Sequence, residues 1–134
     1  MNYWLVKSEP SEYSYDDLVK DGSTYWDGVR NYAARNNLKG MKNNDKVLYY
    51  HSVNEKSVVG ISKVVKEHYQ DPTTEDDRWV VVDLAAVKKL KKPVTLAEIK
   101  AEPKLAHIPL IRQSRLSVMA LDKPAFDLIV NMGS

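Results

Sequence analysis

Short apolar runs separated by polar turn residues divide this chain into about five predicted strands. The runs are rich in β-branched, aliphatic and aromatic residues, which suit the half-buried surface of a sheet. Gly60 interrupts one of the two longest runs, and a glycine inside a strand indicates a bulge or a close backbone approach. The predicted strands cover residues 2–6, 46–50, 57–69, 79–90 and 116–121.

Polar capping residues mark short helices between and after these strands. Ser14 precedes an acidic first turn, and Thr95 with Glu98 forms a capping-box pattern. Predicted helices cover residues 14–20, 32–38 and 95–100, and a last helix runs from Asp122 to Gly133. Strands mixed with short helices predict the α+β class. A small barrel or pseudo-barrel with flanking helices is the simplest arrangement, because closure removes exposed sheet edges.

The chain length and composition predict a single domain over residues 1–134. There is no cysteine, which excludes disulfides and thiolate metal sites and suits a reducing cytoplasm. No signal peptide is visible, and the apolar runs are far shorter than the roughly 20 residues that span a bilayer. No coiled-coil heptad is present. We therefore expect a cytoplasmic monomer without a membrane partner.

The arginines are more informative than the net charge of +2, which is only weak evidence for a nucleic-acid partner. Four of the five arginines fall in two short polar segments. The planar guanidinium matches phosphate oxygens and base edges, whereas lysine mostly supplies diffuse charge. Structural ion pairs are the alternative role, and the sequence leaves both open. These arginines are Arg30, Arg35, Arg112 and Arg115.

Four polar segments lie next to apolar strands, where core and surface patterning does not require them. They cover residues 7–10, 26–36, 49–52 and 112–118. Each also has an ordinary structural interpretation. Ser8 can belong to a plain turn, Trp26 to the core, His51 to a hydrogen-bonded strand end, and Arg115 to a loop anchor.

Taken together and in order, these segments resemble the EVE domain family. The resemblance covers essentially the whole chain, and several independent motifs carry it: residues 3–10 (YWLVKSEP), 26–31 (WDGVRN), 34–36 (ARN), 50–52 (YHS), 59–61 (VGI), 71–73 (DPT) and 115–118 (RLSV). It implies a PUA-like fold, similar to the YTH and ASCH domains. It also implies a reader of a modified base, with a modified cytosine in DNA favoured, that can act with an effector such as a restriction component.

A reader that inspects a whole base must flip it out of a duplex or meet it in a single strand. Stacking on an aromatic ring supplies about 1–3 kcal/mol per base, and Trp26 is the candidate platform, with Trp4, Tyr32 or Tyr50 as a partner. The predicted base pocket comprises Ser8, Glu9, Trp26, Val29, Asn31, Tyr32, Tyr50, His51, Ser52, Leu116 and Ser117. The predicted phosphate-binding residues are Lys7, Arg30, Arg35, Arg112 and Arg115.

Three other functions remain open at this point. The same pocket and arginines would serve an RNA-binding module for tRNA or rRNA. The modest net charge leaves open a small-molecule or protein adaptor without a nucleic-acid role. An enzyme is disfavoured, because a zinc deaminase requires cysteines that the chain lacks. His51 and Ser52 are adjacent and would point to opposite faces of a strand, which makes them a poor catalytic dyad. The acidic residues 71–77, which a metal-dependent nuclease would need as a cluster, are predicted to form a solvated loop. We expect no catalytic residue, metal or cofactor.

Overall fold

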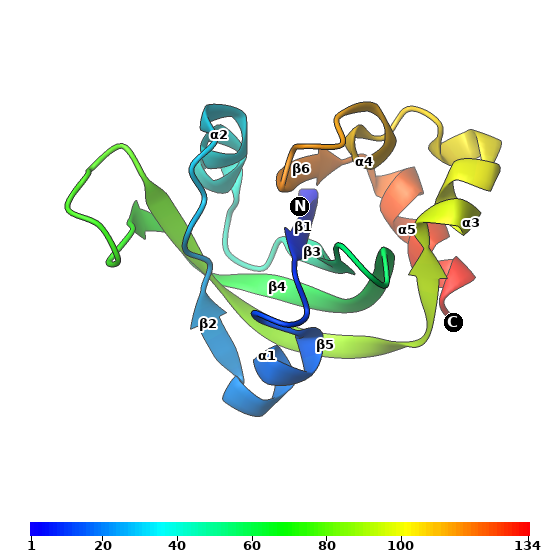
Figure 1. Cartoon of the computed structure of the whole chain (residues 1–134), viewed down its shortest axis with the longest axis horizontal. Helices are drawn as coiled ribbons and strands as arrows, with labels where there is room; N and C mark the ends of the chain where they lie inside the picture. The colour runs from blue at the N-terminus through cyan, green and yellow to red at the C-terminus, as the bar shows by residue number, and fades with distance from the viewer.

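Six strands form one mixed sheet in the computed structural model, which describes every residue from Met1 to Ser134 (Figure 1). The strand order across the sheet is β2-β5-β4-β3-β1-β6. β1 runs parallel to β3 and antiparallel to β6, and all other neighbouring pairs are antiparallel. The strands are β1 (Tyr3–Ser8), β2 (Ser23–Tyr25), β3 (Lys46–His51), β4 (Ser57–Gln70), β5 (Val80–Thr95) and β6 (Val118–Leu121).

The α+β class is confirmed, and two details of the predicted sheet require correction. The sixth strand, β2, has three residues and is too short for alternation to reveal it. No strand pairing joins β2 to β6, so hydrogen bonds do not close the sheet into the expected barrel. The long strands β4 and β5 instead bend together, and their register shifts at several points. Curvature from such irregularities lets an open sheet wrap around a core.

Five α-helices and one 3-10 turn flank the sheet (Figure 1). The predicted caps are confirmed, since Ser14 and Thr95 each form a reciprocal capping box. None of the helices is long and apolar enough to cross a membrane. The helices are α1 (Tyr15–Asp21), α2 (Tyr32–Gly40), α3 (Leu96–Ala101), α4 (Pro109–Arg112) and α5 (Lys123–Met132), with the 3-10 turn at Pro103–Leu105.

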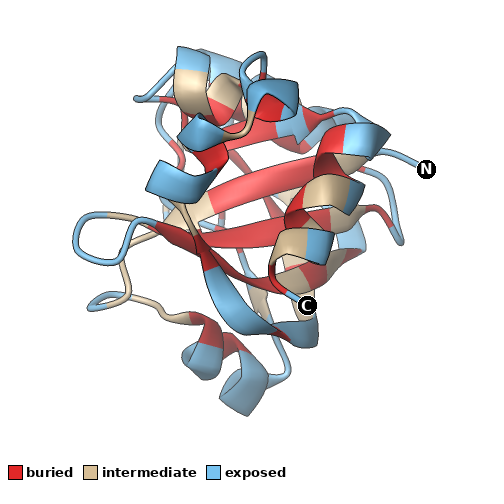
Figure 2. Cartoon of the chain, turned by 90° about the vertical axis from the view of Figure 1, so that its right-hand side faces the viewer, coloured by how far each residue is buried: buried red, intermediate tan, exposed pale blue.

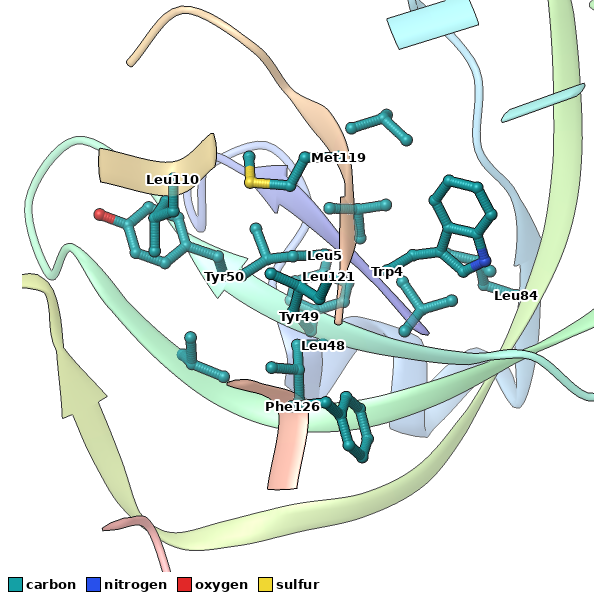
Figure 3. Close-up of a cluster of buried hydrophobic side chains, with 14 of the residues drawn as sticks. Trp4, Leu5, Leu48, Tyr49, Tyr50, Leu84, Leu110, Met119, Leu121 and Phe126 are labelled. Atoms are coloured by element: carbon teal, nitrogen blue, oxygen red, sulfur yellow. The ribbon is translucent and has the colours of Figure 1, made fainter. Parts of the chain in front are cut away.

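The core lies between the sheet and these helices as one cluster of 33 buried hydrophobic residues. The central strands are buried while the outer surfaces of the helices are exposed (Figure 2). Leu5 of β1, Leu48 of β3 and Met119 of β6 are fully buried, and all three belong to the cluster in Figure 3. Burial of apolar side chains on three adjacent strands therefore stabilises the middle of the sheet and excludes water from it.

A buried carboxylate anchors the beginning of β1. Asp45, which is 3% exposed, accepts hydrogen bonds from the backbone N–H of Asn2 and Lys42 and from the Trp4 indole N–H, at 3.0–3.1 Å. Trp4 is thus a core residue whose polar atom is already bonded. It does not contribute to a ligand platform.

Gly60 makes the close approach that the sequence predicts. A Cβ atom at this position would lie 2.5 Å from the Tyr15 ring, and the strand register shifts between Val58 and Gly60. Tyr15 cannot easily move, because it is 1% exposed and its hydroxyl donates to the Ile61 carbonyl at 2.7 Å. The missing side chain of Gly60 is therefore what allows α1 to dock on the sheet.

Gly60→Ala should consequently lower the free energy of unfolding by about 1–3 kcal/mol, because the added methyl overpacks a rigid contact. Urea unfolding followed by circular dichroism measures this change. Val65→Ala, on the same strand but 42% exposed, is the matched control and should shift stability by less than about 0.5 kcal/mol. Equal effects of the two substitutions would contradict the steric account.

Candidate nucleic-acid interface

A cavity of about 500 Å³ opens beyond the end of β1. It lies between the segment that leads into α1 and the segment that follows β2. Its size is in the usual range for pockets that hold small organic ligands. The lining residues are Lys7, Ser8, Glu9, Glu12, Tyr13, Thr24, Tyr25, Trp26, Asp27, Gly28, Val29, Arg30 and Ser117.

The Tyr13 carbonyl fixes one wall of this cavity by accepting two hydrogen bonds. Ser8 Oγ and the Tyr49 hydroxyl each donate to it at 2.7 Å. Burial raises the pKa of Tyr49, so its phenol keeps its proton and remains a donor over the physiological pH range. The Tyr13 hydroxyl in turn donates to Asp21, and burial together with this carboxylate raises the pKa of Tyr13 to about 12.

Trp26 forms the apolar wall. It is 8% exposed, and its ring packs edge-on against Tyr49 with centroids 5.4 Å apart. Its backbone N–H donates to the Val82 carbonyl at 2.8 Å, which extends the pairing of β2 with β5. The indole N–H forms no hydrogen bond within the chain. Since no buried side-chain polar atom lacks a partner, this donor must reach the cavity or solvent.

Asp71 holds the loop after Trp26 in place from outside the cavity. Its side chain is 0% exposed and accepts from the Gly28 N–H at 3.2 Å, Arg30 Nη1 at 3.0 Å and both donors of Thr73. Gly28 has φ of 77°, a conformation that favours glycine. The prediction that Asp71 lies in a merely solvated loop is therefore wrong, because tertiary contacts bury this one carboxylate.

His51 is a structural residue in this fold. It is 7% exposed, and its Nε2 accepts the Tyr15 backbone N–H at 3.0 Å. Nδ1 must then carry the proton and donates to Glu55 Oε2 at 2.9 Å. His51 does not line the cavity, and through its bond to Tyr15 it supports the start of α1.

The structure gathers seven of the sequence-predicted residues around the cavity and places the others elsewhere. Tyr50 and Ser52 line a second cavity, and Asn31, Leu116, Arg112 and Arg115 line a shallow third one. Asn31 also caps α2 by accepting the Ala34 N–H at 3.0 Å. The seven gathered residues are Lys7, Ser8, Glu9, Trp26, Val29, Arg30 and Ser117.

Tyr32 and Arg35 belong to a partly exposed aromatic cluster beside the cavity. Tyr32 stacks on Trp79 with centroids 5.3 Å apart, and the Arg35 guanidinium lies 4.9 Å from the Tyr32 ring centroid. Arg30 lies 5.5 Å from the Trp79 centroid and so connects the cluster to the cavity rim. Arg78 is paired with Asp76 at 2.6 Å.

Sequence reasoning missed six lining residues. Asp27 and Gly28 lie within the motif of residues 26–31 but were not predicted to contact a ligand. Thr24 and Tyr25 lie in the short strand β2, where no sequence pattern indicated a site. Glu12 and Tyr13 precede the α1 cap and resemble ordinary turn residues. Hydrogen bonds from Ser8 of β1 and Tyr49 of β3 to the Tyr13 carbonyl hold this segment at the cavity. The missed residues are Glu12, Tyr13, Thr24, Tyr25, Asp27 and Gly28.

The fold defines the class of protein. The chain superposes on the ASCH protein of Zymomonas mobilis with a TM-score of 0.63, covering 99% of this chain and 96% of that one. The two share only 13% sequence identity, so the likeness concerns the fold alone. It identifies a PUA-like α+β domain.

Within this class the chain belongs to the EVE domain family, whose profile matches residues 2–132. It is 34% identical to thymocyte nuclear protein 1 of Mus musculus, over 98% of this chain and 73% of the relative. Protein Atu2648 from Agrobacterium tumefaciens is 40% identical, with a TM-score of 0.98, and the match covers 100% of this chain and 94% of that one. The human THYN1 protein, solved in complex with 5-methylcytosine-containing DNA, is 32% identical, with a TM-score of 0.93 and coverage of 100% and 98%.

The Asp71 contacts predict a specific pH dependence of stability. Burial opposes ionisation of Asp71, but the hydrogen bonds from Thr73, Arg30 and Gly28 outweigh it and lower its pKa. The ionised carboxylate therefore stabilises the fold at pH values above its unfolded pKa of about 3.9. This contribution is lost as pH falls through the lower, folded pKa.

Asp71→Asn should accordingly reduce the free energy of unfolding by about 1–3 kcal/mol at pH 7, and the deficit relative to the parent should shrink below about pH 4. Urea unfolding at a series of pH values measures both effects. Asp77→Asn, an exposed substitution in the same loop, should show neither. A deficit that stays constant down to pH 2.5 would show that ionisation of Asp71 is not responsible.

Proposed function

We propose that this protein is a binding module that reads a modified base in nucleic acid, with a modified cytosine in DNA as the favoured ligand. The observation that carries the proposal is the cavity bounded by Trp26, which combines an apolar ring, polar side chains and two cationic side chains at one opening. The human THYN1 protein, solved with 5-methylcytosine-containing DNA, supports the choice of ligand.

The chemistry of the cavity suits the edge of a cytosine. The exocyclic amino group of cytosine donates hydrogen bonds, which carboxylates accept. Glu9, Glu12 and Asp27 all line the cavity and provide such acceptors. The unpaired Trp26 indole N–H provides a donor for a ring nitrogen or carbonyl oxygen. A methyl group on the ring would gain contact with the apolar surfaces of Trp26 and Val29.

Lys7 and Arg30 supply positive charge at the same cavity. Arg30 keeps Nε and Nη2 available, because only its Nη1 is bonded to Asp71 and to the Val29 carbonyl. Its side chain remains 40% exposed. A guanidinium that is bonded through one nitrogen and keeps its other nitrogens free can contact a phosphate. Such a contact would fix the position of the nucleic acid along the protein, while the cavity specifies the base.

The proposal assigns binding rather than catalysis to this site. No histidine lines the cavity, and His51 has both ring nitrogens in hydrogen bonds to Tyr15 and Glu55. A general base must instead reach the proton that it removes. The carboxylates and hydroxyls that line the cavity can hydrogen-bond a ligand, which is the role that we propose for them.

Trp26→Ala should weaken binding of a 5-methylcytosine oligonucleotide by about 1–3 kcal/mol, the usual value of aromatic stacking. Fluorescence anisotropy at about 50 mM salt, where phosphate contacts are strong, measures the affinity. Matched DNA and RNA oligonucleotides with plain, 5-methyl and 5-hydroxymethyl cytosine or N6-methyladenine form the panel. The parent should prefer one modified base in DNA, and a preference found only with the RNA oligonucleotides would assign the ligand to RNA.

Two further variants make this test specific to the cavity. Trp26→Phe keeps a ring in the buried position and separates loss of binding from loss of folding. Trp79→Ala removes a tryptophan of the neighbouring aromatic cluster and should leave the preference for the modified base intact. If the parent binds modified and plain oligonucleotides equally, or if folded Trp26→Ala retains full affinity, the proposed function is wrong.

Arg30→Gln should weaken binding to modified and plain oligonucleotides by the same factor, because a phosphate contact carries no base information. It should also lower the slope of log affinity against log salt by about 0.7 for a single strand or 0.9 for a duplex. Lys91→Gln, an exposed substitution on β5, is the charge-matched control. An unchanged salt slope in a folded Arg30→Gln protein would contradict the phosphate role.

A further inference from the structure

A second cavity adjoins the first and has a different chemical character. It has a volume of about 370 Å³ and shares Lys7 with the Trp26 cavity. It lies between the end of β3 and the helices α3 and α4. Its lining includes the three lysines Lys7, Lys56 and Lys100, together with Tyr50, Leu110 and Ser114, and no carboxylate.

The Tyr50 hydroxyl is an unused donor in this cavity. Tyr50 is 3% exposed, yet its hydroxyl forms no hydrogen bond within the chain. Because no buried polar side-chain atom lacks a partner, this hydroxyl must open into the cavity. The ring points outward from the hydrophobic cluster beside Leu110 (Figure 3). Burial raises the pKa of Tyr50, which keeps the phenol protonated and able to donate.

Lys7 connects the two cavities and is held in a defined position. Its Nζ donates to the Ser114 carbonyl at 2.8 Å and lies 5.8 Å from the Tyr50 ring centroid. Burial lowers the pKa of Lys7, so an anion placed beside it would stabilise its charged form. The only carboxylate in the next hollow, Glu55, already accepts a hydrogen bond from His51.

We propose that this second cavity binds a backbone phosphate of the same nucleic acid, next to the nucleotide whose base occupies the Trp26 cavity. Lys7, Lys56 and Lys100 supply the charge, and the Tyr50 hydroxyl donates a hydrogen bond to a phosphate oxygen. The inference rests on the proposed function for the position of the base. Phosphate recognition itself follows from three cations and an unpaired donor around one cavity without a carboxylate.

The test compares four proteins on plain and 5-methylcytosine oligonucleotides over a range of salt concentrations. The double variant Lys56→Ala/Lys100→Ala should weaken binding of both oligonucleotides by the same factor, on the order of tenfold at about 50 mM salt. It should also lower the slope of log affinity against log salt. Tyr50→Phe, which keeps the buried ring, should weaken binding of both oligonucleotides by about fivefold. The control Lys91→Ala/Lys104→Ala removes two exposed lysines outside every described cavity and should resemble the parent.

The outcomes separate this inference from the proposed function. A parent that binds plain and methylated DNA equally would overturn base reading, while the double variant would still report on the phosphate site. If the double variant and Tyr50→Phe bind both oligonucleotides as the control does, the phosphate site is wrong even where the methyl preference persists. A parent that binds neither oligonucleotide at low salt would overturn both.

Discussion

The Tyr49 hydroxyl bonded to the Tyr13 carbonyl is the contact on which the candidate site depends. It joins the buried strand β3 to the segment that leads into α1, at 2.7 Å and away from most solvent. The ring of Tyr49 also packs edge-on against Trp26 on one side and Tyr15 on another. One buried side chain therefore positions the apolar wall, the polar wall and the first helix at the same time. Removing its proton would be costly, and burial keeps that proton in place.

Polar anchors act around this centre in a framework that is otherwise apolar. Asp45 and Asp71 are buried carboxylates that each accept several hydrogen bonds, so neither carries an unsatisfied charge into the core. Asp45 fixes the beginning of β1, whereas Asp71 fixes the loop that carries Gly28 and Arg30. His51 does the same for the start of α1. The cavity is therefore bounded by the ends of β1 and β2 and by irregular segments that these hydrogen bonds anchor, which favours a preformed binding site.

The two cavities differ in chemistry, and in the proposed function this difference would divide recognition between them. The Trp26 cavity contains a ring, carboxylates and small hydroxyls, which are groups that distinguish one base from another. The cavity around Tyr50 contains lysines and an unpaired phenol, which suit a phosphate of any sequence. Lys7 lines both cavities, so a base and its neighbouring phosphate can be held together. Such an arrangement would link specificity to affinity without requiring a larger interface.

The sequence by itself determined the elements with strong local signals and the motifs that form the Trp26 cavity. Capping boxes and long strands follow from local physics, because each depends on a few neighbouring residues. Gly60 indicates a close approach, but the sequence does not identify Tyr15 as the residue that approaches it. The three-residue strand β2, the open edge between β2 and β6, and the burial of Asp71 required the tertiary structure. Tyr50 and His51 follow Tyr49 on β3 and point to opposite faces of the strand, but only the packing of distant segments places Tyr50 at a second cavity and His51 against the start of α1. A sequence reveals which residues can bind a ligand, but only the packing of distant segments decides which of them meet.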